Sequence, residues 1–360
     1  MGNPSQYLLC LRFKLRQTIA REILRWRLIR LWMAERRPLL LFVRFGGIGD
    51  IICSLPAYAA VCRANPATQG VFVTRSAYQS LPLLIRAPGS ICLSRIRCPI
   101  PRLPRWLVYQ TLTPQYSDEL GHPSSSFNLV DEFYRACGLQ AEAQARLRFY
   151  FPPGRAKEVC ASLNLDTGGA AKCVVIHTGP SWKVREWPAE SWQVLVDGLR
   201  KALPSVRIFQ IGANAQLDAN KPAPSVHNIE SLVGKLSLAE MAAFLAGVDL
   251  FVGIDSGMIH MAVAAGTAVV GLFGPTNPGR IPQDSKTIGM WHPLPCSFCH
   301  HRQPRLHFRT GCPHGIACMK DLEPARVLQM CLNLLNRPLV FPANTCSRTA
   351  LPAVPPSSMS

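Results

Sequence analysis

From residue 39 onward, short runs of apolar residues alternate with longer segments in which apolar residues recur every three or four positions. The short runs predict buried strands at 39–45, 71–73, 173–177, 206–211, 250–253 and 268–273. The longer segments predict helices at 50–64, 126–137, 189–202, 237–246, 257–265 and 324–335. Residues 86–120, rich in Pro and Arg, show neither pattern. Apolar strands that alternate with helices require a parallel sheet covered on both faces, so we expect an α/β protein with two doubly wound domains and a cleft between them.

The boundaries of these domains follow from breaks in the pattern. Two prolines and a glycine at 152–154, and then the run Asp-Thr-Gly-Gly at 166–169, indicate a junction. We therefore expect an N-terminal domain over 38–165 and a C-terminal domain over 166–336. Residues 337–360 are rich in Pro, Ser and Ala, which predicts a disordered tail.

Residues 1–37 stand apart from both domains. Within 5–37, nine Lys and Arg residues face only Glu22 and Glu35, a local charge of +7. A stripe of helical spacing is formed by Leu8, Leu11, Leu15, Ile19, Ile23, Trp26, Ile29 and Met33. The pattern predicts a basic amphipathic helix that lies on the inner face of the cytoplasmic membrane. The alternative is a helix that packs on its own domain and leaves its basic face in water.

Composition narrows the class of protein and of partner. Of 360 residues, 48% are hydrophobic and 17% charged, which excludes a largely disordered chain. The net charge of +18 favours anionic partners such as phosphates or lipid headgroups. Because no basic face interleaved with aromatic residues is present, we expect no nucleic-acid partner. Most of the fourteen cysteines lie in apolar segments, and no run is long enough for a membrane span, so we expect a cytoplasmic protein.

Candidate chemistry lies in the turns that join strands to helices, because doubly wound sheets bind ligands at the carboxyl ends of their strands. One such turn carries three glycines followed by Asp50. Another carries Asp255, Ser256 and Gly257 at a predicted helix start, where free N–H groups favour a phosphate. Gly274 follows the next strand and forms a second lip at the same edge.

Five motifs in order then resemble glycosyltransferase family 9, the ADP-heptose:lipopolysaccharide heptosyltransferases. They are Gly49-Asp50 with Leu55-Pro56-Ala57, Trp187-Pro188 with Trp192, the set Leu232, Gly234, Ser237 and Leu238, the run from Asp255 to His260, and Phe273-Gly274-Pro275-Thr276. The resemblance covers about residues 39–335. It implies a GT-B fold of two facing Rossmann-like domains, with the donor bound in the C-terminal domain and the acceptor in the N-terminal one.

The resemblance also implies the roles of single residues. The donor diphosphate would be bound by Arg185, Lys183, Ser256, Gly257, Met258 and Thr276, and the donor sugar or nucleotide by Asp255, Asn214, His260 and Gly274. Asp50 would be the general base, although an Asp at a helix start is also an ordinary cap. Two positions depart from the family: Arg185 replaces a usual Lys, and Asn214 replaces an acidic residue.

The implied function is an inverting transfer of heptose from ADP-heptose to the lipopolysaccharide inner core, with Kdo or heptose as acceptor and with no cofactor or metal. Another nucleotide sugar, a sugar-nucleotide epimerase, or a non-enzymatic basic protein that binds lipid or nucleic acid are the alternatives. Cys296, Cys299, Cys312 and Cys318 have partial zinc-ligand spacing, so they are either loop thiols or a structural metal site.

Overall fold

The computed structural model describes residues 4–85, 91–94, 101, 103–104, 106–115, 128–140, 147–165, 171–212, 224–302 and 311–336, with side chains from residue 14 onward except at 91–94 and 301–302. The expected junction at 166–169, the tail at 337–360 and Asn214 lie outside the described residues. None of the described helices is both long and apolar enough to cross a membrane.

The N-terminal sheet contains four parallel strands. These are β1 (Leu39–Val43), β2 (Gln69–Thr74), β3 (Ile91–Ser94) and β4 (Val108–Leu112), in the order β3-β2-β1-β4. The chain runs outward from β1 to β3 and then returns to the other side of β1. The order of strands therefore reverses between β1 and β4, as in a doubly wound sheet.

The C-terminal sheet repeats this plan with six parallel strands. They are β5 (Cys173–His177), β6 (Arg207–Gln210), β7 (Glu230–Ser231), β8 (Leu250–Ile254), β9 (Ala268–Phe273) and β10 (Thr287–Trp291), in the order β10-β9-β8-β5-β6-β7. The reversal lies between β5 and β8, so these two strands should frame a ligand site at their carboxyl ends.

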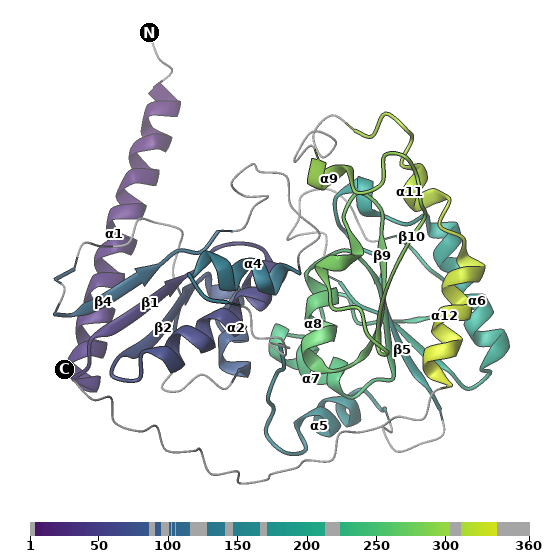
Figure 1. The fold of residues 1–360 in the computed structure, drawn as a ribbon, viewed down its shortest axis with the longest axis horizontal. Helices are drawn as coiled ribbons and strands as arrows, with labels where there is room; N and C mark the ends of the chain where they lie inside the picture. Colours follow the sequence, from purple (N-terminus) through teal and green to yellow (C-terminus); the bar gives the residue numbers. More distant parts are fainter. Residues whose placement is uncertain are drawn as a thin grey trace, which may run out of the picture.

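Helices cover both faces of the C-terminal sheet (Figure 1). One face packs against α6 (Ala189–Ala202) and α12 (Pro324–Leu335). The other packs against α7 (Leu238–Ala246) and α8 (Gly257–Ala265), with α5 (Arg155–Ser162) beyond α7. Side chains of alternate residues along β5, β8 and β9 enter the two cores, which explains why these strands are apolar at every position.

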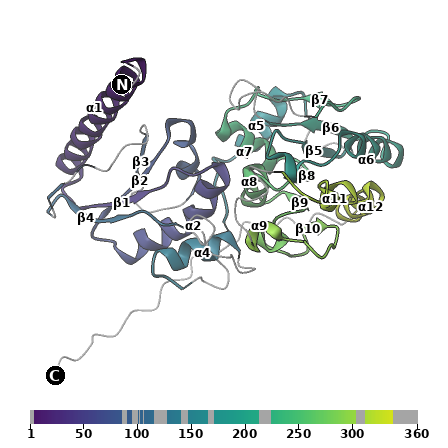
Figure 2. The same ribbon diagram turned by 90° about the horizontal axis from the view of Figure 1, so that it is seen from above.

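The two sheets meet through α2 (Ile48–Ala64), which packs on the inner face of the N-terminal sheet beside α4 (Leu129–Ala136). The same hydrophobic core extends from α2 to α7 and α8 of the C-terminal sheet. Figure 2 shows α2 and α4 on the side of the N-terminal sheet that faces α8. This contact brings the starts of α2 and α8 together and so positions the site.

The outer face of the N-terminal sheet is covered by α1 (Pro4–Glu35), the predicted N-terminal helix. Leu24 and Leu28 are buried there against β1 and β2. The residues of the predicted stripe that the structure describes as exposed lie on the opposite side of the helix: Leu15, Ile19, Ile23, Trp26 and Met33. The helix therefore has two apolar faces, and the sequence pattern identified the exposed one.

Some elements were missed. β3 and β4 lie within the Pro- and Arg-rich stretch 86–120, where the sequence shows neither periodicity. β10 is short, contains Gly289 and has partly exposed residues, so it lacks the continuous apolar run on which the other predictions rested. β7 has only two residues, both exposed.

Candidate active site

Asp50 lies in the first turn of α2, directly after the glycine turn that follows β1. Its Oδ2 accepts a hydrogen bond from the Gly47 N–H at 2.7 Å and lies 3.6 Å from Nη2 of Arg44. A Cβ on Gly46 would collide with the carboxylate, so this turn needs a glycine there. The Asp50 side chain remains 21% exposed. It caps the helix through one oxygen, and its role as a general base stays a prediction.

Arg44, which the sequence analysis did not identify, is fixed beneath this turn. Its side chain is 6% exposed, donates to the Pro114 carbonyl at 3.0 Å and lies over the Phe133 ring at 4.9 Å from the ring centroid. A buried guanidinium held in this way gives the start of α2 a fixed positive charge beside Asp50.

The start of α8 lies opposite the start of α2. Ser256 is the N-cap of α8, and its Oγ accepts a hydrogen bond from the Met258 N–H at 3.3 Å. A Cβ on Gly257 would lie 2.7 Å from the Gly49 nitrogen, so the two helix starts can approach this closely only with glycine at these positions. Helix N-termini carry partial positive charge, so both contribute to a positive potential at the interface.

Asp255 is buried between Arg185 and Thr276. Its Oδ2 accepts a hydrogen bond from the Thr276 Oγ1 at 2.5 Å and lies 3.4 Å from Nε of Arg185. Burial alone would raise the pKa of Asp255, but Arg185 and the Thr276 hydrogen bond outweigh burial and lower this pKa below its ordinary value. The carboxylate is therefore ionised and holds both partners in place.

Arg185 belongs to the short 3₁₀ turn Lys183–Arg185 that follows β5. In addition to its ion pair, Arg185 donates to the Asp255 carbonyl at 3.3 Å and lies over the Trp182 ring at 4.4 Å. Lys183 in the same turn is exposed. Both cations stand at the carboxyl end of β5, where the reversal of strand order predicts a ligand site.

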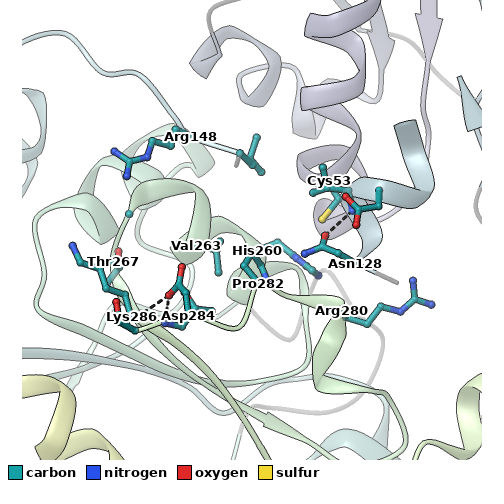
Figure 3. A pocket seen from close by; sticks show the side chains of 16 residues that line it. Cys53, Asn128, Arg148, His260, Val263, Thr267, Arg280, Pro282, Asp284 and Lys286 are labelled. Carbon is teal, nitrogen blue, oxygen red and sulfur yellow. Dashed lines mark hydrogen bonds between the residues drawn. The ribbon is translucent and has the colours of Figure 1, made fainter. Parts of the chain in front are cut away.

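A cavity of about 380 Å³ lies between the two domains along α8, from His260 to Thr267, and neither Asp255, Arg185 nor Asp50 lines it. Figure 3 shows His260 and Arg280 from the C-terminal domain and Cys53 and Asn128 from the N-terminal one along its wall. Burial lowers the pKa of His260 to about 4, so its imidazole is neutral at pH 7. Burial lowers the pKa of His177 equally, to about 4, and its Nδ1 lies 3.1 Å from the Ile211 carbonyl.

The structure thus gathers most of the predicted site residues. Asp255, Ser256, Gly257, Met258, Thr276, Arg185 and Lys183 lie at the carboxyl ends of β5, β8 and β9, and Asp50 lies across the interface. Gly274 lies against Cys318 and Met319, whose sulfur atoms leave no room for a Cβ. Contacts of all these residues with a donor stay predictions.

The four clustered cysteines also come together. Cys296, Cys299, Cys312 and Cys318 line one cavity of about 20 Å³ beside Gly274 and Pro275. As the side chains are oriented, the described residues contain no group of three ligands that could hold a metal ion. The structural metal site therefore stays an untested alternative to loop thiols.

Parts of the sequence are similar to known glycosyltransferases. Residues 135–308 match the sequence profile of glycosyltransferase family 9 (heptosyltransferase). This matched stretch, just under half of the chain, is similar to glycosyltransferase family 9. The chain is 26% identical over 316 residues to lipopolysaccharide heptosyltransferase 1 of Pseudomonas aeruginosa, in an alignment that covers 72% of this chain and 85% of that protein. A shorter match, 28% over 118 residues, relates it to lipopolysaccharide heptosyltransferase 1 of Escherichia coli K12, covering 33% of this chain and 36% of that one.

Solved structures of glycosyltransferases share the fold of this chain. The iron-containing dodecameric glycosyltransferase TibC from enterotoxigenic E. coli aligns with a TM-score of 0.61 at 19% identity, over 83% of this chain and 76% of that one. E. coli ADP-heptose heptosyltransferase II aligns with a TM-score of 0.56 at 17% identity, over 83% and 98%. The predicted GT-B fold of two facing Rossmann-like domains is confirmed.

Proposed function

We propose that this glycosyltransferase transfers heptose from ADP-heptose to the lipopolysaccharide inner core, with Kdo or heptose as acceptor and with inversion at the anomeric carbon. The names of its relatives support the substrates. One structural observation carries the proposal: the strand reversals of both sheets face each other, with the Asp255, Arg185 and Thr276 cluster on one side and Asp50 on the other.

The proposed chemistry uses this arrangement directly. The diphosphate lies at the α8 start, where Arg185 and Lys183 supply positive charge. Asp50 accepts the proton of the acceptor hydroxyl while the hydroxyl oxygen attacks the anomeric carbon of the donor. The bond from that carbon to the diphosphate breaks. ADP leaves with the bonding electron pair, and the helix start and the two cations stabilise its charge. Asp255 contributes by holding Arg185, and no metal is needed for this step.

A panel of donors tests the proposal. Thermal unfolding is measured with ADP-, UDP-, GDP- and dTDP-linked sugars, since a ligand that binds the folded state raises its stability. ADP-heptose should give the largest increase, and a purified inner-core acceptor should gain the mass of one heptose. A larger increase with another nucleotide sugar, or a donor sugar epimerised without transfer, would contradict the proposal.

We further propose that α1 places the enzyme on the inner face of the cytoplasmic membrane. Trp26 is 63% exposed and Leu15 is 61% exposed on the face that points away from the sheet. Exposed basic residues lie along both flanks of this face: Lys14 and Arg25 on one side and Arg16, Arg27 and Arg30 on the other. An apolar strip between two basic flanks fits an anionic lipid surface.

Point variants test this better than deletion, because deleting α1 would also uncover the core around Leu24 and Leu28. Ile19→Ser with Trp26→Ser should abolish sedimentation with phosphatidylglycerol vesicles and leave transfer to a detergent-dispersed acceptor unchanged. The control is Val194→Ser on α6, which removes an apolar side chain of similar exposure (55%) far from α1. Equal vesicle binding by the wild-type protein, the Ile19→Ser with Trp26→Ser variant and the Val194→Ser control would exclude this face as the membrane contact.

A further inference from the structure

A buried ion pair joins the two domains beside the proposed site. Arg280 ends the 3₁₀ turn Pro278–Arg280 after β9, and Glu132 lies on α4. Nη1 of Arg280 is 3.5 Å from Oε1 of Glu132, and the side chains are only 8% and 3% exposed. Removing two charges from water is unfavourable, and a buried pair seldom adds net stability. Stability alone therefore does not account for it.

Each charge comes from a different part of the fold. Glu132 is held by the packing of α4 on α2, within the N-terminal domain. Arg280 is held beside β9 and β10 of the C-terminal domain. The pair can exist only while the domains are closed on each other, because separating them moves the two side chains apart. Closure is also what brings Gly49 against Gly257.

Arg280 also lies near the groups that would react. It lines the interdomain cavity together with Asn128 and His260 (Figure 3). The charge of Arg280 affects the pKa of Asp255, of His260 and of Cys53. Cys53 lies one turn beyond Asp50 on α2, and the charge of Asp50 affects its pKa as well. The ion pair is therefore located where the two halves of the proposed site meet.

We propose that Glu132 and Arg280 are positioning residues. Their pairing sets the closed arrangement in which Asp50 faces the turn Asp255–Gly257 at the start of α8, here called the donor turn. Neither residue is assigned a step in the transfer, and both act through the relative position of the domains. This inference rests on the proposed function only in that transfer occurs between the domains. The donor turn lies entirely in the C-terminal domain, so nucleotide binding should not depend on the pair.

The experiment separates positioning from binding. Glu132→Gln keeps the shape of the side chain and removes its charge, so kcat should fall at least tenfold while the Kd for ADP stays within twofold of the wild-type value. Arg280→Gln should show the same loss, and the double variant should be no worse than either single one, because the two residues act as a unit. Glu158→Gln is the matched control, since its partner Arg155 forms an exposed ion pair at 3.2 Å.

Hydrogen exchange gives a readout that is independent of the sugar. Peptides covering 46–54 and 255–261 should exchange at least fivefold faster in Glu132→Gln, and the charge-exchanged double variant Glu132→Arg with Arg280→Glu should restore protection. If wild-type protein fails to transfer heptose but shows this exchange pattern, the proposed substrate is wrong and the positioning role stands. Wild-type kcat in Glu132→Gln, additive single effects, or a parallel loss of ADP binding would overturn the inference. Should Glu132→Gln fail to fold, Arg280→Lys, which keeps the charge and loses the planar fork, is measured in its place with the same criteria.

Discussion

The two domains present a similar design at their facing edges: a strand, a turn, an aspartate at a helix start and an arginine beside that aspartate, although Arg44 belongs to the same turn as Asp50 and Arg185 comes from the turn after β5. In the C-terminal domain, Asp255 is buried and engaged by both Arg185 and Thr276. In the N-terminal domain, Asp50 lies slightly farther from Arg44, at 3.6 Å, and keeps about a fifth of its side chain exposed. The first aspartate is suited to hold a binding site, and the second is suited to accept a proton.

This difference shows that an aspartate at a helix start has no fixed role. The turn supplies the position, and the number of partners decides what the carboxylate can do. A carboxylate whose lone pairs are used by buried donors is a poor base, because its pKa is lowered and its oxygens are not reachable. Changing each aspartate in turn therefore tests the comparison.

The largest effect is expected at Asp50. Asp50→Asn keeps the hydrogen bond from Gly47 but removes the proton acceptor, so turnover should fall by roughly 10²–10⁴ while donor affinity stays nearly unchanged. Titration calorimetry with donor and a rate assay measure the two quantities separately. Near wild-type turnover would reduce Asp50 to a helix cap.

Asp255→Asn should act on folding and on the donor site together. Arg185 would lose its ionic partner in a buried place, and the free energy of unfolding should fall by about 3 kcal/mol. Urea denaturation measures this loss. Asp50→Asn is the matched variant, since its pair is more exposed, and it should destabilise the protein less; equal losses would contradict the difference between the two pairs.

Acid should weaken the C-terminal domain through its buried histidines. The pKa values of His177 and His260 are about 4 in the folded protein, well below the ordinary value of 6.5. Between these two values the unfolded chain binds protons that the folded chain does not, so stability falls as the pH drops from about 6.5 to about 4. Each histidine contributes at most about 3 kcal/mol. Urea titrations at pH 7 and pH 4.5 measure the loss, and His177→Gln should reduce it; a loss of equal size in that variant would exclude His177 as a source.

The smallest effect is expected at Arg185. Arg185→Ala should weaken ADP binding by roughly 10–150-fold, the value of one charge-assisted hydrogen bond. Adenosine, which lacks the diphosphate, should bind equally to both proteins, and Arg185→Lys should recover part of the affinity. Unchanged ADP affinity, or a strict need for added divalent cation, would overturn the assignment of the diphosphate to this side.

The sequence predicted the C-terminal domain in more detail than the N-terminal one. The helices at 189–202, 257–265 and 324–335 and the strands at 173–177 and 268–273 agree with the structure residue for residue. Their strands are buried on both faces, which leaves an unambiguous apolar run. In the N-terminal domain, β4 has exposed residues and follows a Pro-rich segment, so no pattern distinguished it.

The site was predictable as far as motifs extend along the chain. The turn from Asp255 to Gly257 and the lip at Thr276 were both identified, because each is a local pattern. The ion pairs that decide their chemistry were not. Arg185 and Asp255 are 70 residues apart, and Glu132 and Arg280 come from different domains. Such pairs leave no periodicity in the sequence and depend on how the domains close.

The proposed contact of α1 with lipid would restrict which hydroxyl group of the acceptor is glycosylated. One face of the helix is fixed to the outer side of the N-terminal sheet, and the other is proposed to lie on lipid. The thickness of one helix and one sheet then separates Asp50 from the bilayer, a height of about 20 Å. Because neither layer can be compressed, the N-terminal domain would hold Asp50 at a fixed distance from the bilayer. The enzyme would then glycosylate the acceptor sugar that lies at that distance from the membrane.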